Sequence, residues 1–350
     1  MSVVALRGFA VDLATPLATA AGDIETRAGT IVRVDIGGAT GVGEATPLPG
    51  WTESPSECRG ALERARDDGV PPGPEAPAAR HAVTTAYRDA FARRAGRAVA
   101  ATLARGSPPL SVPANATVGD GTVAETVADA ETAVASGYRT VKLKVGTRPV
   151  EEDVDRVRAV DDALGAAETN DTDGDAIALR VDANGGWDRA DARRALAALE
   201  GLVEYVEQPL PADDLAGHAA LRGVGAPVAL DESLTQYRVG EVIAAGAADA
   251  VVLKPMALGG PSRALAAGRA AAHAGVDPVV TTTIDAAVAR TAAVHVAAAL
   301  PDGDERAHGL ATGDLLATDL VADDPAPVAD GRIMVPAGPG LAGNAFGGLA

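Results

Sequence analysis

The feature that most constrains this chain is a strand followed by a helix, a pair that repeats from Leu110 onward. Short apolar runs rich in β-branched residues alternate with helical patterns at a spacing of roughly 25 residues, about one βα unit each. About eight such units in ~200 residues favour an α/β fold of the (β/α)8-barrel type over an open doubly wound sheet. No Gly-x-Gly-x-x-Gly follows a first strand, so the sequence lacks the motif that would support a dinucleotide-binding fold.

The predicted barrel covers residues 111–319, and hydrophobic periodicity defines its elements. We predict its strands at residues 111–118, 140–145, 177–183, 203–206, 228–230, 250–253, 279–283 and 308–311. We predict its helices at residues 123–136, 152–164, 189–199, 215–221, 239–245, 263–274 and 286–299.

The first 110 residues have a different pattern, and we predict that they form an α+β capping domain over residues 1–110. Residues 3–9 and 29–36 are predicted strands, with an irregular loop over residues 14–27 between them. A Gly- and Pro-rich loop over residues 41–51 is expected to expose Trp51, and two helices should follow at residues 56–68 and 77–95. The Gly- and Pro-rich tail, residues 320–350, is expected to pack back on this domain and complete it.

Charge and composition limit the partners of the chain. Its net charge of −18 disfavours nucleic acid and anionic membranes. The acidic residues are spread along the chain, and an Asp-rich, Lys-poor surface of this kind indicates a halophilic, haloarchaeal cytoplasm. We find no signal-peptide pattern and no apolar run that could span a bilayer. The single cysteine, Cys58, excludes an intramolecular disulfide, and no feature of the sequence defines an oligomeric state.

Only three lysines occur in the whole chain, namely Lys142, Lys144 and Lys254. Arginine stays protonated at any usable pH, whereas lysine can lose its proton when burial or a nearby cation disfavours its charge. Lys142 and Lys144 are two residues apart in a predicted strand, so they point to the same face, where each disfavours the charge of the other. This pattern indicates a base that works near neutral pH. The alternative is a solvated strand edge with lysines that prevent aggregation, which the scarcity of lysine disfavours.

Three carboxylates, Asp182, Glu207 and Asp231, follow three successive predicted strands. They are 25 (207 − 182) and 24 (231 − 207) residues apart, which places one acid on each neighbouring strand at the rim where barrel enzymes build their sites. Converging carboxylates repel one another unless a cation neutralises them, and Mg²⁺ prefers oxygen ligands. Any one of them could instead cap a helix or form a rim ion pair. Lys144 and Lys254 should flank the three carboxylates, which suits removal of a proton α to a carboxylate while Mg²⁺ takes the enediolate charge.

These residues resemble the muconate-lactonizing subgroup of the enolase superfamily. The motifs are Lys142-x-Lys144, Asp182-x-Asn184, Glu207-Gln-Pro, Asp231-Glu-Ser and Leu253-Lys254-Pro. Within that subgroup the chain looks most like the o-succinylbenzoate synthase family of menaquinone biosynthesis, through residues 43–51, 179–184, 281–285 and 308–312.

The resemblance implies dehydration of 2-succinyl-6-hydroxy-2,4-cyclohexadiene-1-carboxylate to o-succinylbenzoate, a small-molecule carboxylate reaction with Mg²⁺ that Mn²⁺ can replace. Lys144 would remove the α-proton and then protonate the departing hydroxide. Lys254 would lie against the opposite face of the ring in a cation–π contact. Lys142 would favour the neutral amine of Lys144 and contact the substrate carboxylate. The resemblance implies supporting roles, at the site floor, the metal or the substrate, for Arg180, Asn184, Trp51, Thr282, Thr283 and Asp285.

One segment departs from the synthase pattern, because Thr282-Thr283-Ile284-Asp285-Ala286-Ala287 stands in place of a Ser-Ser-x-x-Glu-Ser-Ser type segment. Racemisation of N-acylamino acids or epimerisation of dipeptides stays an alternative, since it uses the same two lysines. A single acid here, instead of Asp-x-Asp, disfavours the epimerase. A muconate-type cycloisomerase and a non-catalytic barrel are further alternatives, although the last predicts the loss of a site group and all six are present.

Overall fold

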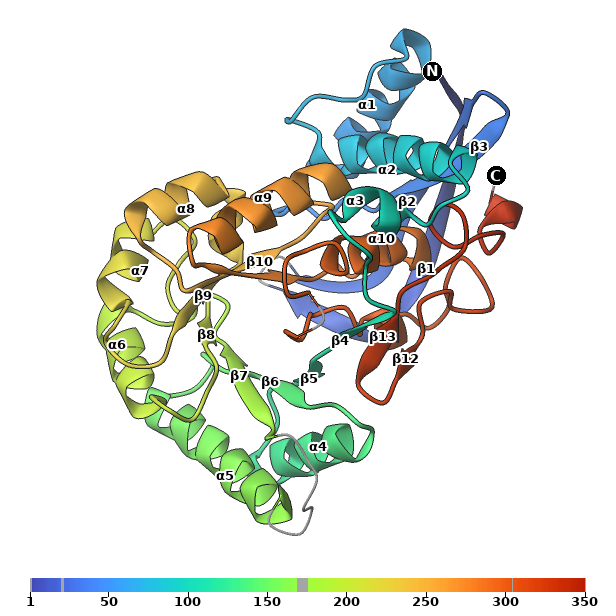
Figure 1. Cartoon of the computed structure of the whole chain (residues 1–350). Coiled ribbons are helices and arrows are strands. Elements are labelled where there is room, and N and C mark those ends of the chain that lie inside the picture. The colour runs from blue at the N-terminus through green and yellow to red at the C-terminus, as the bar shows by residue number, and fades with distance from the viewer. Residues whose placement is uncertain (1, 20–21, 169–175, 304, 350) are drawn as a thin grey trace.

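A seven-stranded sheet of parallel strands lies at the centre of this computed structural model, which describes residues 2–19, 22–168, 176–303 and 305–349 (Figure 1). Each strand pairs with the next one along the chain, so the spatial order follows the sequence. The strands are β5 (Ala116–Val118), β6 (Thr140–Lys144), β7 (Ala178–Asp182), β8 (Val206–Glu207), β9 (Val228–Leu230), β10 (Ala250–Leu253) and β11 (Asp277–Val280).

Helices alternate with these strands and cover their outer face, and α5 to α8 follow one another around the outside of the molecule (Figure 1). They are α4 (Val123–Ala135), α5 (Val150–Glu168), α6 (Arg189–Ala198), α7 (Leu215–Leu221), α8 (Val239–Ala245), α9 (Pro261–His273) and α10 (Ala287–Ala297), with the 3-10 turns η1 (Glu232–Thr235) and η2 (Gly313–Leu315).

Residues 308 and 309 join the two edges of the sheet. Ala114, which precedes β5, forms a parallel bridge with His308, and Thr281, which follows β11, forms one with Gly309. A sheet closed in this way has no free edge, which is the property of a barrel. The predicted fold class, a (β/α)8-type barrel with an N-terminal capping domain, is confirmed.

Alternation along the strands decides which side chains enter the barrel. Val141 and Leu143 of β6 are fully buried in the apolar layer beneath the helices. Lys142 and Lys144 occupy the alternate positions, so they project to the other face, into the barrel. The same alternation in β7 buries Val181 under the helices and turns Asp182 inward.

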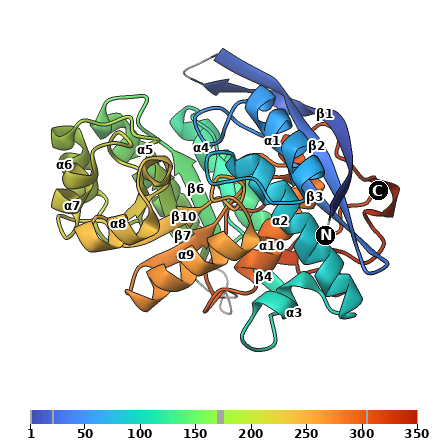
Figure 2. The same cartoon turned by 90° about the horizontal axis from the view of Figure 1, so that it is seen from above.

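The N-terminal unit is a three-stranded antiparallel sheet covered by helices, and it packs against the barrel (Figure 2). The first helix of this unit begins with an N-terminal capping box, which Ser54 forms with Glu57. The elements are β1 (Ser2–Thr19), β2 (Gly22–Ile36), β3 (Ala39–Ala45), α1 (Pro55–Asp68), α2 (Pro77–Arg94) and α3 (Val99–Leu103).

Two loop predictions in this unit are wrong. Most of the predicted irregular loop, residues 14–27, belongs to the long hairpin of β1 and β2, in which Val11 pairs with Arg27 and Leu17 with Ile24. The pairing shifts register between Asp12 and Leu17, in the segment that contains Pro16, and proline is tolerated in a sheet where ladder pairing is interrupted. Residues 41–45, predicted as part of a loop, belong to β3.

The predicted strand over residues 111–118 is divided, because only β5 enters the barrel while β4 (Ser111–Pro113) joins a separate sheet with β12 (Val328–Ala329) and β13 (Arg332–Met334). The last described element is η3 (Gly347–Leu349). The tail also reaches the N-terminal unit, since the Val99 N–H donates to the Gly340 carbonyl over 2.9 Å. The division at residues 110 and 320 stays a prediction. Among the described residues, no helix is long and apolar enough to cross a membrane.

Candidate active site

The predicted lysines and carboxylates come together at one rim of the barrel because each stands at the carboxyl end of its strand. Lys144, Asp182 and Glu207 are the last residues of β6, β7 and β8, and they stand opposite one another in the sheet register. Asp231 directly follows β9, and Lys254 directly follows β10. The regular βα spacing thus converts distant sequence positions into neighbours.

The lysines of β6 bind the carboxylates of the two neighbouring strands. The Lys142 ammonium donates to Asp182 Oδ2 over 2.9 Å and to both carboxylate oxygens of Glu207 over 3.0 Å. Lys144 Nζ donates to the same Asp182 oxygen over 2.7 Å and to Asn184 Oδ1 over 2.8 Å. Across the rim, the Lys254 ammonium donates to the carboxylate of Asp231.

Burial and mutual repulsion set the electrostatics of these groups. Burial raises the pKa of Glu207, and the neighbouring Asp182 charge raises it further. Burial likewise raises the pKa of Asp231, against the opposing effect of Lys254. Burial alone would also raise the pKa of Asp182, but the Lys142 and Lys144 ammonium groups hold it below its ordinary value. Burial opposes the charge of Lys142, yet the carboxylates of Asp182 and Glu207 raise its pKa well above the usual range.

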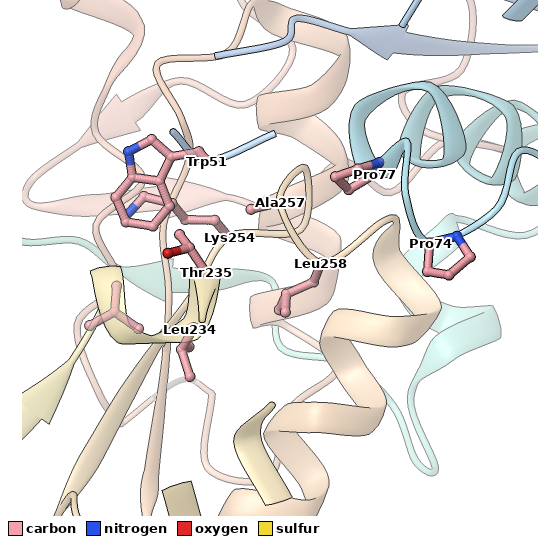
Figure 3. Close-up of a pocket in the computed structure, with 9 residues that line it drawn as sticks. Trp51, Pro74, Pro77, Leu234, Thr235, Lys254, Ala257 and Leu258 are labelled. Atoms are coloured by element: carbon pink, nitrogen blue, oxygen red, sulfur yellow. The ribbon is translucent and has the colours of Figure 1, made fainter. Parts of the chain in front are cut away.

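Lys144 and Lys254 stand on opposite sides of the barrel rim. The strands β6 and β10 are four steps apart in the sheet order, and a barrel of seven strands plus one closing segment has eight positions around its circle. The Lys254 ammonium lies under the indole ring of Trp51, 3.7 Å from the ring centroid (Figure 3). Trp51 is half-buried here, and this contact is a cation–π interaction between the capping unit and the barrel.

A cavity of about 180 Å³ opens beside this pair (Figure 3). Leu234 and Thr235 of η1 form one wall, and Leu258, on the loop that follows Lys254, forms another. Pro74 and Pro77 of the capping unit line it from above the rim. A cation, an aromatic ring and several apolar side chains therefore border this space, which suits a carboxylate that carries a ring or a hydrocarbon arm.

Asn184 lies at the mouth, in a left-handed backbone conformation with φ of +45°. Its amide nitrogen donates to Glu232 Oε1 over 2.9 Å. Glu232 directly follows Asp231, and the 3-10 turn η1 places it at the rim. Gln208, which follows Glu207 in the sequence, accepts through its side-chain oxygen from the backbone N–H groups of Asp231 and Ser233, over 3.0 and 3.1 Å. It thereby fixes the segment that carries Glu232.

Arg180 lies inside the barrel and not at its mouth. It is fully buried, its Nε donates to Glu204 over 2.7 Å, and one Nη donates to the Ala307 carbonyl over 2.8 Å. Its guanidinium also lies over the ring of Tyr205, 4.8 Å from the centroid. Arg180 is the register partner of Lys142 on the neighbouring strand, and it lies inside the barrel, below the carboxylates.

The predicted substrate contacts after β11 face the N-terminal unit. Thr283 and Asp285 are buried, and the Thr283 hydroxyl donates to the Asp285 carboxylate. Ile284 between them has a φ of +58°, which marks a sharp local turn. Thr282 pairs with the hydroxyl of Thr312 over 3.1 Å. These three predicted residues thus lie in the contact between the two units or against the closing segment.

Two buried charged residues in that contact, Glu44 and Arg27, were not predicted from the sequence. Glu44 is fully buried and accepts from the backbone N–H groups of Ala286 and Ala289, at the start of α10, over 2.8 and 2.9 Å. Arg27 donates to backbone carbonyls of both units, among them Thr46 over 2.9 Å and Thr283 over 3.2 Å. Glu44 stood in a motif that carried the family resemblance, but nothing in the local pattern indicates a partner more than 200 residues away.

The donor chemistry of the rim fits a divalent cation. Asp182, Glu207 and Asp231 are buried carboxylates on three adjacent strands, and burial together with neighbouring carboxylates raises the pKa of Glu207 and Asp231. Oxygen ligands of this kind suit Mg²⁺. Within the described part of the chain, no three acidic, histidine or cysteine side chains are gathered closely enough to hold an ion as they stand, because the ammonium groups of Lys142 and Lys254 lie against the carboxylates.

The chain is similar to one family model and to proteins of known activity. The model of the family described as enolase C-terminal domain-like matches residues 125–343. The o-succinylbenzoate synthase of Thermobifida fusca (strain YX) is 41% identical over 226 residues, which cover 61% of this chain and 63% of that protein. The chain therefore spans less than two thirds of the length of this curated relative.

Two further relatives point to other activities on the same fold. The N-succinyl-L-Arg/Lys racemase of Bacillus cereus is 37% identical over 173 residues, 48% of this chain and 44% of that protein. The dipeptide epimerase of Enterococcus faecalis V583, solved with Mg and the dipeptide L-Leu-L-Tyr, has a TM-score of 0.83 and 26% identity, and the match covers 97% of this chain and 98% of that one.

Proposed function

Since this chain belongs to the enolase C-terminal domain-like family, and thereby to the enolase superfamily, we propose that it is a carbon–oxygen lyase that makes o-succinylbenzoate. Its substrate would be 2-succinyl-6-hydroxy-2,4-cyclohexadiene-1-carboxylate, and its role a step of menaquinone biosynthesis. The observation that supports this proposal most is the placement of Lys144 and Lys254 on opposite sides of the rim with three carboxylates on the strands between them.

Lys144 is the proposed base. Its neutral amine takes the proton from the carbon α to the carboxylate, and the electron pair of that C–H bond is delocalised onto the carboxylate as an enediolate, from which it forms the new ring double bond as the hydroxyl departs. The bond between the adjacent ring carbon and the hydroxyl then breaks, with its electron pair going to oxygen. The proton on Lys144 passes to the departing hydroxide, so that water leaves and the ring becomes aromatic. General base catalysis by a positioned side chain contributes about 10²–10⁴-fold to such a step.

The proposed roles of the other residues follow from where they lie. Asp182, Glu207 and Asp231 would hold Mg²⁺, or Mn²⁺ in its place, which supplies a Lewis acid for the negative charge that develops on the substrate carboxylate. Lys142 would contact the substrate carboxylate. Lys254 would face the substrate ring from the side opposite Lys144, with Trp51 as the aromatic wall above it.

Racemisation of an N-succinylamino acid is the second candidate. The specific observation in its favour is the 37% identity to the Bacillus cereus racemase. One lysine on each face of an α-carbon would exchange its proton, so the geometry of Lys144 and Lys254 suits this reaction as well. The acidic composition supports a halophilic cytoplasm as the setting of either reaction.

The test is to supply purified protein, at high salt with Mg²⁺, with the cyclohexadiene substrate and, separately in D₂O, with N-succinylamino acids and L-Ala-L-Glu. We expect o-succinylbenzoate to form, followed by its absorbance, and NMR to report any exchange of α-protons in the amino acid derivatives. Exchange without dehydration would replace the synthase by the racemase. Removal of Mg²⁺ by a chelator should stop turnover, and its return should restore it.

A further inference from the structure

A chain of three hydrogen-bonded side chains ends at Lys144. Lys144 Nζ donates to Asn184 Oδ1 over 2.8 Å, and Asn184 Nδ2 donates to Glu232 Oε1 over 2.9 Å. The second Glu232 oxygen, Oε2, is buried and has no hydrogen-bond partner in the described part of the chain. The three residues come from the ends of β6, β7 and β9, and no role in the proposed reaction has been given to Glu232.

The carboxylate of Glu232 determines which end of the Asn184 amide faces Lys144. A carboxylate only accepts hydrogen bonds, so Asn184 must present its NH₂ group to Glu232. The amide oxygen is thereby left for Lys144. The backbone N–H of Asn184 donates to Asp182 Oδ1 over 3.1 Å and holds the residue in its left-handed conformation. The amide therefore cannot turn over without losing its bond to Glu232.

This arrangement defines the geometry around the nitrogen of Lys144. Two of its tetrahedral directions are directed at acceptors, Asp182 Oδ2 at 2.7 Å and the Asn184 oxygen. In the neutral amine these two directions hold the two N–H bonds, and the lone pair must take the remaining direction. We infer that Glu232 is a positioning residue that, through Asn184, directs the lone pair of Lys144 toward the substrate. The inference rests on the proposed role of Lys144 as the base.

The backbone around Glu232 is rigid enough for this role. The buried Gln208 side chain accepts from the N–H groups of Asp231 and Ser233, which flank Glu232 on both sides. Its amide nitrogen donates to the Leu210 carbonyl over 2.9 Å and to the Ser233 hydroxyl over 2.8 Å. A positioning group is effective only when its own support is fixed in this way.

Two variants of Glu232 separate positioning from simple charge. Glu232→Met and Glu232→Gln remove the same charge, but only Gln keeps an oxygen that can accept from Asn184. We expect Glu232→Met to lower kcat about 10- to 100-fold with little change in KM, because the base is misdirected while the binding groups remain. Glu232→Gln should recover most of kcat. Equal losses in both variants would show that charge alone matters and would overturn the inference.

A second readout does not depend on the reaction. The chain has only three lysines, so acylation by an amine-reactive ester can be followed at each of them by peptide mass spectrometry. We expect Glu232→Met to lower the acylation rate of Lys144 several-fold relative to that of Lys254, because the lone pair is no longer directed into the site, and Glu232→Gln to leave the ratio near that of the unsubstituted protein. An unchanged ratio in Glu232→Met would overturn the inference whatever the substrate is.

The controls distinguish a failure of the inference about Glu232 from a failure of the proposed function. Glu151→Gln removes a charge from an exposed ion pair with Arg194 on the outer helices, and it should leave both readouts unchanged. If Glu232→Met does not fold, Asn184→Gly removes the amide but tolerates the positive φ, and it should give the same low kcat and lowered Lys144 acylation. If the unsubstituted protein neither dehydrates nor exchanges any substrate, the proposed function fails, and the acylation ratio still decides the role of Glu232.

Discussion

Lysine is kept in this chain only where a mobile proton or a compact charge is useful. The three lysines all bind carboxylates at the barrel rim, and the arginines fill the structural positions, as Arg180 does inside the barrel. Buried ion pairs are costly to form because both charges lose water, so their presence here is better explained by function than by stability. Removing one partner leaves an unpaired buried charge, which makes each of these residues sensitive to substitution.

Lys144→Arg keeps the positive charge beside Asp182 but loses the base, because arginine stays protonated at any usable pH. We expect turnover to fall by at least about 10²-fold while the protein keeps its fold. Steady-state kinetics with the cyclohexadiene substrate and thermal unfolding measure the two effects. Turnover close to that of the unsubstituted protein would refute Lys144 as the base.

At this scale the sequence allowed the lysines and the carboxylates to be predicted as neighbours, because the βα period alone places them at one rim. It did not allow the direction of side chains in irregular segments to be predicted. Thr283 and Asp285 follow a strand, as Asp231 does, yet the turn at Ile284 directs them to the N-terminal unit. Their direction depends on partners such as Arg27 that are remote in the sequence.

The contact between β3 and α2 depends on glycine in the strand. Gly41 and Gly43 lie against the backbone of α2, and a Cβ added to Gly43 would collide with the Ala82 carbonyl. The alanines of α2 on the same side, among them Ala82 and Ala86, are fully buried. Small residues on both elements thus allow strand and helix backbones to approach closely.

Gly43→Ala should destabilise the protein by about 1–3 kcal/mol, because the helix must move away from the strand to make room for the methyl group. Chemical denaturation measures the loss. The matched control is Gly165→Ala in α5, where no described atom outside the helix's own backbone lies within 4 Å of the new Cβ and alanine is the better helix former. We expect that variant to be stabilised by up to about 1 kcal/mol. Equal effects at the two sites would contradict the close-approach explanation.

The order and type of the barrel elements could be predicted because buried parallel strands are short apolar runs and the helices between them have their own period. The hairpin of β1 and β2 was missed over residues 14–27, since the segment with Pro16 lacks regular alternation. The pairing with β2 stabilises it as strand, and such pairing is a property of two segments together. The division of residues 111–118 between two sheets also depends on the tail, which supplies the partner of β4.

The two structural units are held together by a buried polar contact around Glu44. Its carboxylate accepts from two N–H groups at the start of α10, a favourable position for negative charge, and Arg27 donates to carbonyls on both sides. Burial, together with the nearby Asp285 charge, nevertheless raises the pKa of Glu44 to about 7. The contact between the units is therefore sensitive to pH near neutrality.

The sign of this sensitivity follows from linkage. Because the folded-state pKa of Glu44 lies above its unfolded value near 4.5, the folded state binds more protons between these pH values, and stability falls as the pH rises through about 7. Across this pH range the titration of Glu44 lowers the free energy of unfolding by about 3 kcal/mol in total. Glu44→Gln cannot titrate, so its free energy of unfolding should vary less between pH 5 and pH 8 than that of the unsubstituted protein.

Denaturant unfolding at several pH values, at constant high salt, measures the difference between the two proteins. Glu151→Gln is the control, since Glu151 is exposed on α5 and its removal should leave the pH dependence unchanged. Parallel curves for Glu44→Gln and the unsubstituted protein would show that Glu44 does not titrate in this range.

The closure of the barrel by residues 308 and 309 has a consequence for how the chain is synthesised. The ribosome makes the strands in their spatial order, so β5 and β11 are both open edges until the segment that bridges them has emerged. The edge at β5 therefore stays unpaired while nearly 200 further residues are translated, and during that time it could pair with another nascent chain. Residues made after this segment then fasten β4 and α3 as well, so that both units are locked only after every barrel strand has been synthesised.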